Sequence, residues 1–157
     1  MVMDTEITGP AGLDDVDRRL LALLAEDARR PYAELAERVG LSPASVHARV
    51  RKLERRGVIR RYTIETDPDR LGHHVAALVA VQQQPGYHWE RLEAAFRQLP
   101  AVEAAYSVTG EDTYVLLVRV ASPTELEDLL RNINSLEGVA RTRTSLILST
   151  TFERRRI

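Results

Sequence analysis

The sequence predicts an α+β fold in which a small helical unit precedes a unit of mixed strands and helices. Apolar residues recur at the spacing of amphipathic helices up to about residue 56, and strand-like segments alternate with helical ones from residue 74 onward. The 157 residues, 44% apolar and 29% charged, suit one average or two small globular units. Small units bury a modest share of their surface, so we expect oligomerisation.

The first predicted helix follows Asp14, a suitable N-cap residue, and has apolar residues at i, i+4, i+7 and i+8 counted from Val16. We expect it to end near residues 29–30, because Pro31 follows. Residues 32–39 have the apolar spacing of a second, short helix.

A tight turn separates this second helix from a third. Gly40 is placed to adopt the left-handed conformation that ends a helix. Ser42 and Pro43 suit the cap and the first position of the next helix, which we expect to run to about Arg56. Ala36 is small enough to let the two helices cross closely. The pattern is that of a helix-turn-helix.

Positive charge is concentrated on the third helix and the residues after it. Residues 42–62 contain seven basic residues and one acid, although the whole chain has a net charge of −1. The outer face of the helix has short and hydrogen-bonding side chains suited to a DNA major groove. The arginines placed where flanking phosphates would be are Arg49, Arg55, Arg56, Arg60 and Arg61. The predicted DNA-binding residues are Ser42, Ala44, Ser45, His47, Ala48, Arg49, Arg51, Lys52 and Arg55.

A three-helix packing motif with a solvated basic face is the simpler explanation of the same segment. The glycine turn, the small crossing residue, the capped helix start and the clustered charge occur together here, and this coincidence favours binding to double-stranded DNA. After the third helix, Val58-Ile59 and residues 62–64 predict a strand pair, or wing, which a turn around Pro68 and then Gly72 would close.

The second half of the chain predicts four strands and two helices in the order β-α-β-β-α-β. This order consists of two split βαβ units, which form a ferredoxin-like sandwich with both helices on one face of the sheet. A partner subunit is the natural cover for the other face. A proline at the first helical position and a capping box open the second helix. The predicted segments are strand 74–82, helix 89–99, strand 102–108, strand 114–120, helix 122–133 and strand 139–152.

The turn at Gly110, Glu111 and Asp112 is the one candidate ligand site in this half. A glycine turn offers backbone N–H groups to a carboxylate, and an acid offers a partner to an ammonium group, so an amino acid would fit. The same residues are also typical of an ordinary hairpin turn, and the residues alone leave both explanations open.

Several kinds of chemistry are not expected. The absence of cysteine excludes disulfides and thiolate sites. Glu111-Asp112 and His73-His74 are adjacent pairs in extended segments, so their side chains point in opposite directions. Phosphate-binding and nucleophile motifs are also missing. We therefore expect no enzymatic activity, cofactor or metal. Without a secretory signal or a membrane-length apolar run, we expect a cytoplasmic protein with no membrane partner.

Taken together, the motifs resemble the Lrp/AsnC (feast/famine) family over about residues 13–152. Each stretch is weak by itself, and the set is specific. The stretches are Leu13–Arg18, Ala33–Ala36, Gly40–Pro43, Arg49–Glu54, Gly57–Ile59 with Tyr62, Thr109-Gly110 with Tyr114–Leu116, and Val139 with Thr142 and Thr144.

The resemblance implies a winged helix-turn-helix followed by a ferredoxin-like ligand-sensing domain. It implies homodimers that assemble to tetramers or octamers and an amino acid or related effector bound between dimers. One departure is that an acid, Asp112, precedes Thr113 where the family commonly has an aromatic residue and then an acid. The effector-binding residues that it implies are Gly110, Glu111, Asp112, Thr113, Tyr114, Thr144 and Ser145.

The sequence thus predicts a DNA-binding transcription regulator that responds to an amino acid or a related small molecule. One alternative is an architectural DNA-binding protein without an effector. Another is a regulatory subunit of an amino-acid enzyme. The predicted parts are a flexible arm (1–12), a winged helix-turn-helix DNA-binding domain (13–62), a linker (63–72), a ferredoxin-like sensing and oligomerisation domain (73–153) and a tail (154–157).

Overall fold

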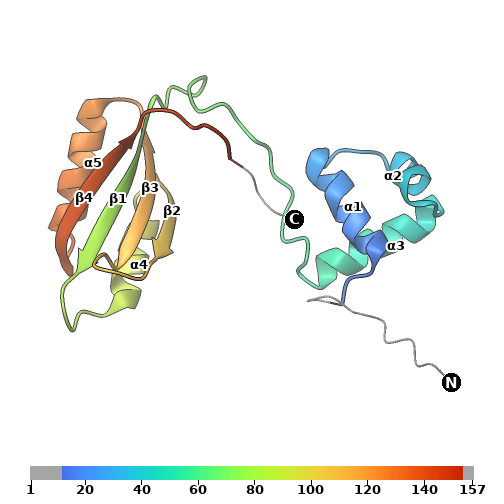
Figure 1. Ribbon diagram of the computed structural model, residues 1–157, viewed down its shortest axis with the longest axis horizontal. Helices are drawn as coiled ribbons and strands as arrows, with labels where there is room; N and C mark the ends of the chain where they lie inside the picture. Colours follow the sequence, from blue (N-terminus) through green and yellow to red (C-terminus); the bar gives the residue numbers. More distant parts are fainter. Residues whose placement is uncertain (1–11, 154–157) are drawn as a thin grey trace. The chain divides into compact units, whose positions relative to one another are not determined.

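The structure, a computed structural model, describes residues 12–153 (Figure 1). Contacts divide these residues into two units, 12–65 and 66–153. Nearly all of the predicted arm and all of the predicted tail lie outside the described residues.

The N-terminal unit consists of three helices around a small apolar core. They are α1 (Asp15–Glu26), α2 (Tyr32–Val39) and α3 (Pro43–Arg55). Each contributes fully buried side chains, Leu20 from α1, Leu35 from α2, and Val46 and Val50 from α3. These are the residues that the amphipathic spacing placed inward, so the predicted helical core is confirmed.

Local hydrogen bonds explain where these helices begin. The Asp14 carboxylate accepts from the backbone N–H of Asp17 at 2.7 Å, and the Asp17 carboxylate accepts from the N–H of Asp14, which completes a capping box. The Ser42 hydroxyl accepts from the N–H of Ser45 at 3.2 Å, with Pro43 at the first position of α3. Both starts agree with the sequence prediction.

Helix ends depend on the residues that follow them. Gly40 has φ +70°, as expected for the left-handed residue that closes α2. The prediction for α1 is wrong by about one turn, because the helix ends at Glu26 and not near residue 30. Asp27 adopts an extended conformation, and its carboxylate accepts from the N–H of Arg29 at 2.8 Å. This side chain offers the backbone an alternative to further helix.

The predicted wing does not form strands in this structure. The N–H groups of Val58 and Ile59 both donate to the carbonyl of Leu53, at 2.9 and 3.2 Å, and so cap the end of α3. The Tyr62 hydroxyl donates to the Glu54 carboxylate at 2.9 Å, which holds the segment beside α3. These donors are therefore unavailable for a ladder, and a two-stranded ribbon alone is only marginally stable.

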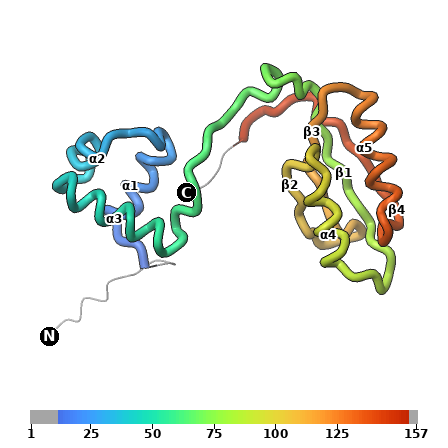
Figure 2. Tube along the Cα trace, turned by 180° about the vertical axis from the view of Figure 1, so that it is seen from behind, coloured from blue at the N-terminus to red at the C-terminus, as the bar shows by residue number. Residues whose placement is uncertain are grey.

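The C-terminal unit is a four-stranded antiparallel sheet in the order β2-β3-β1-β4, with two helices on one face (Figure 2). This is the ferredoxin-like arrangement predicted from the element order. In chain order the elements are β1 (Val75–Gln83), α4 (Trp89–Arg97), β2 (Val102–Ser107), β3 (Tyr114–Val120), α5 (Pro123–Ser135) and β4 (Val139–Ile147).

The predicted last strand is too long. β4 ends at Ile147, because its only neighbour, β1, begins at Val75 and the pairing stops at Ala76 opposite Ile147. The predicted capping box of α5 is also incomplete. The Ser122 hydroxyl accepts from the N–H of Glu125 as expected, but the Glu125 carboxylate accepts from the N–H of Ala121.

The core of this unit lies between the sheet and the helices. The central strands contribute Val79 and Leu116, and the helices contribute Phe96 and Ile133, all at most 1% exposed. Neither α4 nor α5 covers the opposite face of the sheet, and residues that alternate with the core positions are accordingly more open. Leu78 on β1 is 40% exposed.

Candidate nucleic-acid interface and ligand sites

The outer face of α3 presents the side chains expected to meet DNA. Of the predicted DNA-binding residues, all except Arg49 are exposed. Arg51, Lys52 and Arg55 form no ion pair with another described residue. The only acid of α3, Glu54, accepts the hydrogen bond from Tyr62. The structure therefore brings three unpaired cations and several small side chains to one helix face.

Arg49 is placed differently from the prediction. One guanidinium nitrogen lies 2.6 Å from the Asp14 carboxylate and 2.8 Å from the Asp17 carboxylate. Asp17 is buried, with 8% of its side chain exposed, while the Arg49 side chain is 34% exposed. Arg49 thus links the middle of α3 to the start of α1. Its charge is balanced by two acids, so Arg49 has a structural role in this unit, and its contact with DNA stays a prediction.

The surroundings of this ion pair alter the acidity of its members. The pKa of Asp14 lies below its ordinary value of 3.8, mainly because the backbone N–H of Asp17 donates to the carboxylate, with a further contribution from Arg49. Hydrogen bonds from Arg49 to both carboxylates raise the pKa of the guanidinium. The pair is therefore charged at neutral pH.

An aromatic contact orients one predicted base-reading residue. The ring of His47 on α3 meets the ring of Tyr32 on α2 edge-on, with 5.2 Å between the ring centres. Tyr32 was not selected by sequence reasoning as a site residue. The spacing of apolar residues in the sequence predicts that α2 and α3 pack together, but it does not predict which of their exposed side chains touch.

The turn between β2 and β3 brings two acids near two arginines of β4. The Asp112 carboxylate lies 2.6 Å from the guanidinium of Arg143 and is only 15% exposed. Glu111 is exposed and lies 3.9 Å from Arg141. Sequence reasoning selected the two acids but missed the arginines, because β4 lies about 30 residues further along the chain. The two acids face different cations and do not form a carboxylate pair.

The remaining predicted effector residues are divided between the two faces of the sheet. Tyr114 and Thr144 lie on the helix-covered face, opposite Val81 and Val79. Ser145 pairs with Leu78 on the uncovered face. The backbone N–H of Thr113 donates to the carbonyl of Val81, and its hydroxyl accepts from the N–H of Gln83 at 3.1 Å. The seven residues therefore do not line one cavity within a single chain.

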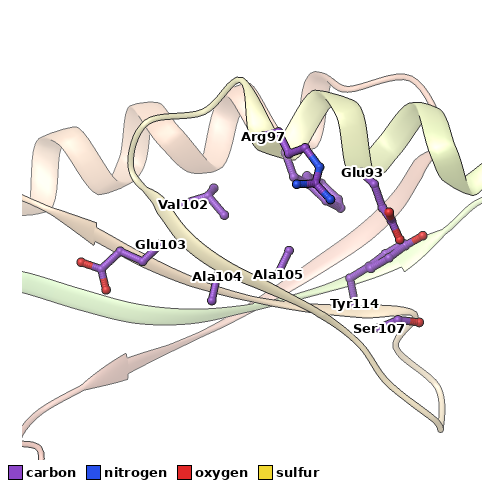
Figure 3. Close-up of a pocket in the computed structure, with 9 residues that line it drawn as sticks. Glu93, Arg97, Val102, Glu103, Ala104, Ala105, Ser107 and Tyr114 are labelled. Atoms are coloured by element: carbon purple, nitrogen blue, oxygen red, sulfur yellow. The ribbon is translucent and has the colours of Figure 1, made fainter. Parts of the chain in front are cut away.

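Tyr114 belongs to the core of its unit. It is 3% exposed and its ring meets Phe96 edge-on at 5.4 Å. Burial, and then the nearby charges of Glu93 and Glu90, raise the pKa of its hydroxyl. This hydroxyl stays protonated at neutral pH and borders a cavity of about 240 Å³ between α4 and β2 (Figure 3).

No helix between residues 12 and 153 is long and apolar enough to cross a membrane. The same residues contain no cluster of three or more histidine, aspartate or glutamate side chains that is arranged to hold a metal ion.

The described chain thus consists of a helix-turn-helix unit and a ferredoxin-like unit, and comparison with known proteins identifies the family. The model of the AsnC-type helix-turn-helix domain matches residues 13–54. The model of the Lrp/AsnC ligand binding domain matches residues 75–157. The chain belongs to the Lrp/AsnC family, which confirms the resemblance found in its motifs.

Similar proteins cover almost the whole chain. The transcriptional regulator LrpA of Mycobacterium tuberculosis is 45% identical over 91% of this chain and 95% of its own length. The regulator LysM of Saccharolobus solfataricus is 33% identical over 92% and 99%.

Solved structures agree with this assignment. A feast or famine regulatory protein of M. tuberculosis in complex with L-methionine has a TM-score of 0.86 and 44% identity, over 92% of this chain and 98% of that one. AsnC of E. coli has a TM-score of 0.86 at 29% identity, over 91% and 97%. The protein described here is a transcription regulator with a DNA-binding and a ligand-binding domain.

Proposed function

We propose that the protein binds double-stranded DNA through the outer face of α3. The observation that supports this best is the row of exposed cations, Arg51, Lys52 and Arg55, without an acidic partner among the described residues. Small side chains at Ala44 and Ala48 allow the helix to approach the floor of a major groove. The cations then contact bases or phosphates on either side.

The test is a titration of the upstream DNA of the protein's own gene, followed by fluorescence anisotropy at several salt concentrations. Arg51→Ala should weaken binding, and if Arg51 contacts a phosphate the slope of log affinity against log salt should fall by about 1. Arg91→Ala, an exposed arginine on α4, is the matched control. Unchanged affinity and salt slope in Arg51→Ala would contradict this placement of the DNA.

We propose that an amino acid bound at the β2–β3 turn adjusts DNA binding or assembly. The site would comprise Gly110, Glu111, Asp112, Thr113 and Tyr114, completed by Thr144 and Ser145 of a neighbouring chain, since these two do not complete one cavity within a chain. The turn supports this, because its glycine offers backbone N–H groups to the carboxylate of an amino acid and its acids offer a partner to the ammonium group.

A melting experiment tests this proposal. L-methionine should raise the melting temperature of the full chain, because a ligand that binds only the folded state stabilises it. Asp112→Asn should reduce that rise and leave DNA binding unchanged. If none of the twenty amino acids changed the melting temperature, the architectural DNA-binding alternative would be preferred. Absence of DNA binding would favour the third possibility, a regulatory subunit of an amino-acid enzyme.

We also propose that the uncovered face of the sheet pairs with a second copy in a homodimer, and that dimers assemble to tetramers or octamers. Leu78 and Tyr106, 40% and 54% exposed, lie on this face with Leu117. Leu78→Glu should lower the molar mass measured by light scattering; an unchanged mass would contradict this interface. Finally, we propose that the protein is non-enzymatic and cytoplasmic, because DNA is its proposed binding partner. We also propose a DNA-binding domain at 13–62, a linker at 63–72 and a sensing domain at 73–153.

A further inference from the structure

The cavity between α4 and β2 is separate from the turn at residues 110–113. Its lining combines the apolar side chains of Phe96 and Val102 with the polar side chain of Tyr114. Ala105 and Ser107 lie on the helix side of β2, because they pair with Leu116 and Tyr114, which face the core from β3. Both residues are nevertheless exposed. These two small residues leave the space open beside α4.

Two opposite charges border this space. Glu93 and Arg97 extend from α4 toward β2 (Figure 3). They are four residues apart on one helix, a spacing at which such residues commonly pair with each other. Here neither forms an ion pair or hydrogen bond with another described residue. The third charged residue at the rim, Glu103, is already paired with Arg119 at 3.0 Å.

We propose that this cavity is a second ligand site of the chain and that it binds a free α-amino acid with an apolar side chain. The Arg97 guanidinium would receive the carboxylate and Glu93 the ammonium group, which are attached to the same carbon and so fit two charges side by side. The side chain of the ligand would lie on Phe96, Val102 and Ala105.

Size and charge agree with this class of ligand. A volume of about 240 Å³ is below the range of roughly 300–1,000 Å³ typical for drug-sized molecules, so it suits a single amino acid. Tyr114, which also lines the cavity, offers a hydroxyl as a hydrogen-bond donor. A nucleotide or another polyanion would be repelled by Glu93 and Glu103 at the rim.

The site goes beyond the effector turn in the proposed function. Asp112 and Arg143 act on the uncovered face of the sheet, as the pairing of Arg143 with Ala80 shows, whereas this cavity opens on the helix-covered side of β2. The two proposed sites share Tyr114, but substitutions at Asp112 on one side and at Glu93, Arg97 or Ala105 on the other can disable them independently.

The experiment is titration calorimetry of the full chain with L-leucine, L-valine and L-methionine. Glu93→Gln and Arg97→Gln should each weaken one class of binding site by about tenfold or more, because each removes a charge-assisted hydrogen bond. Ala105→Phe should abolish that class by filling the cavity. Arg91→Gln, on the same helix but outside the cavity, and Asp112→Asn, at the turn, should leave it intact.

Two ligand analogues sharpen the result. N-acetyl-L-leucine lacks the ammonium group and L-leucinamide lacks the carboxylate, so neither should compete with L-leucine at this site. The proposal is overturned if no amino acid binds the wild-type chain, or if binding is unaffected by Glu93→Gln, Arg97→Gln and Ala105→Phe. Loss of binding only in Asp112→Asn would place the ligand at the turn instead. DNA binding by the same variants, measured in parallel, reports on the proposed regulatory function separately.

Discussion

At the scale of single residues, Arg49 shows how a basic residue on a DNA-binding helix can have a structural role. It points back toward α1, where it neutralises Asp14 and the buried Asp17. The neighbouring cation Arg51 remains exposed. Substituting each of the two residues therefore distinguishes the contribution of charge to stability from its contribution to DNA binding.

Arg49→Ala should lower the free energy of unfolding of the N-terminal unit by about 1–3 kcal/mol, because Asp17 would lose its cationic partner while still shielded from water. Urea denaturation followed by circular dichroism measures this change. Arg51→Ala serves as the control and should leave the stability unchanged. Equal stability of Arg49→Ala and the wild-type protein would show that the ion pair contributes nothing net.

The low pKa of Asp14 predicts an acid-dependent loss of stability. Since the folded-state pKa lies below the ordinary value of 3.8, the stabilisation is fully present above that pH and is lost as the pH falls through the folded-state pKa. Asp14→Asn should therefore show a shallower decline in stability below about pH 4. Denaturation curves from pH 2 to pH 7 provide the measurement, and parallel declines for the two proteins would contradict the assignment.

At the scale of elements, the start of β4 is fixed by a close approach between distant segments. Gly138 has φ +92°, and a Cβ added there would overlap the ring of Tyr87, which precedes α4. The carbonyl of Gly138 also accepts from the N–H of Gln84 at 2.7 Å. Glycine is required here both for its backbone conformation and for the absence of a side chain.

Gly138→Ala should therefore destabilise the C-terminal unit by more than the about 1–2 kcal/mol of a left-handed backbone alone. Tyr87→Ala should remove part of this additional cost when the two substitutions are combined. A double-mutant cycle measured by thermal or urea unfolding isolates the coupling. Strict additivity of the two substitutions would mean that the ring yields freely and that backbone strain is the whole effect.

At the scale of the whole molecule, the two units have separate cores. Leu35 and Val50 belong to the N-terminal cluster, and Phe96 and Leu116 to the C-terminal one, and no buried residue belongs to both. DNA contacts and ligand contacts are therefore proposed in units that are each stabilised by their own packing. A ligand effect on DNA binding would act through assembly or through the connection between units.

Phe96→Ala should lower the stability of the C-terminal unit by about 3–5 kcal/mol, the usual cost of an aromatic cavity in a core. In differential scanning calorimetry we expect one transition to move to lower temperature while the N-terminal one stays in place. Leu35→Ala is the reciprocal control and should move only the N-terminal transition. A single transition that moves equally in both variants would show that the units unfold together.

Local chemistry was readable from the sequence. Several signals depend only on neighbours a few residues apart: the cap at Asp14, the glycine end at Gly40, the Ser42-Pro43 start and the alternation of the second half. They identified the helices, the order of the strands along the chain and the family. The wing failed as a prediction, because the N–H groups of Val58 and Ile59 bond to the end of α3 and not to a second strand.

Contacts between residues far apart in the chain were decided only by the tertiary structure. The partners of Arg49 are 32 and 35 residues away, and Arg143 meets Asp112 across 31 residues. The cavity bordered by Glu93 and Arg97 exists only because β2 packs beside α4. Periodicity specifies which face of an element is apolar, whereas the chain topology determines which charged side chains meet, and the proposed ligand sites depend on those meetings.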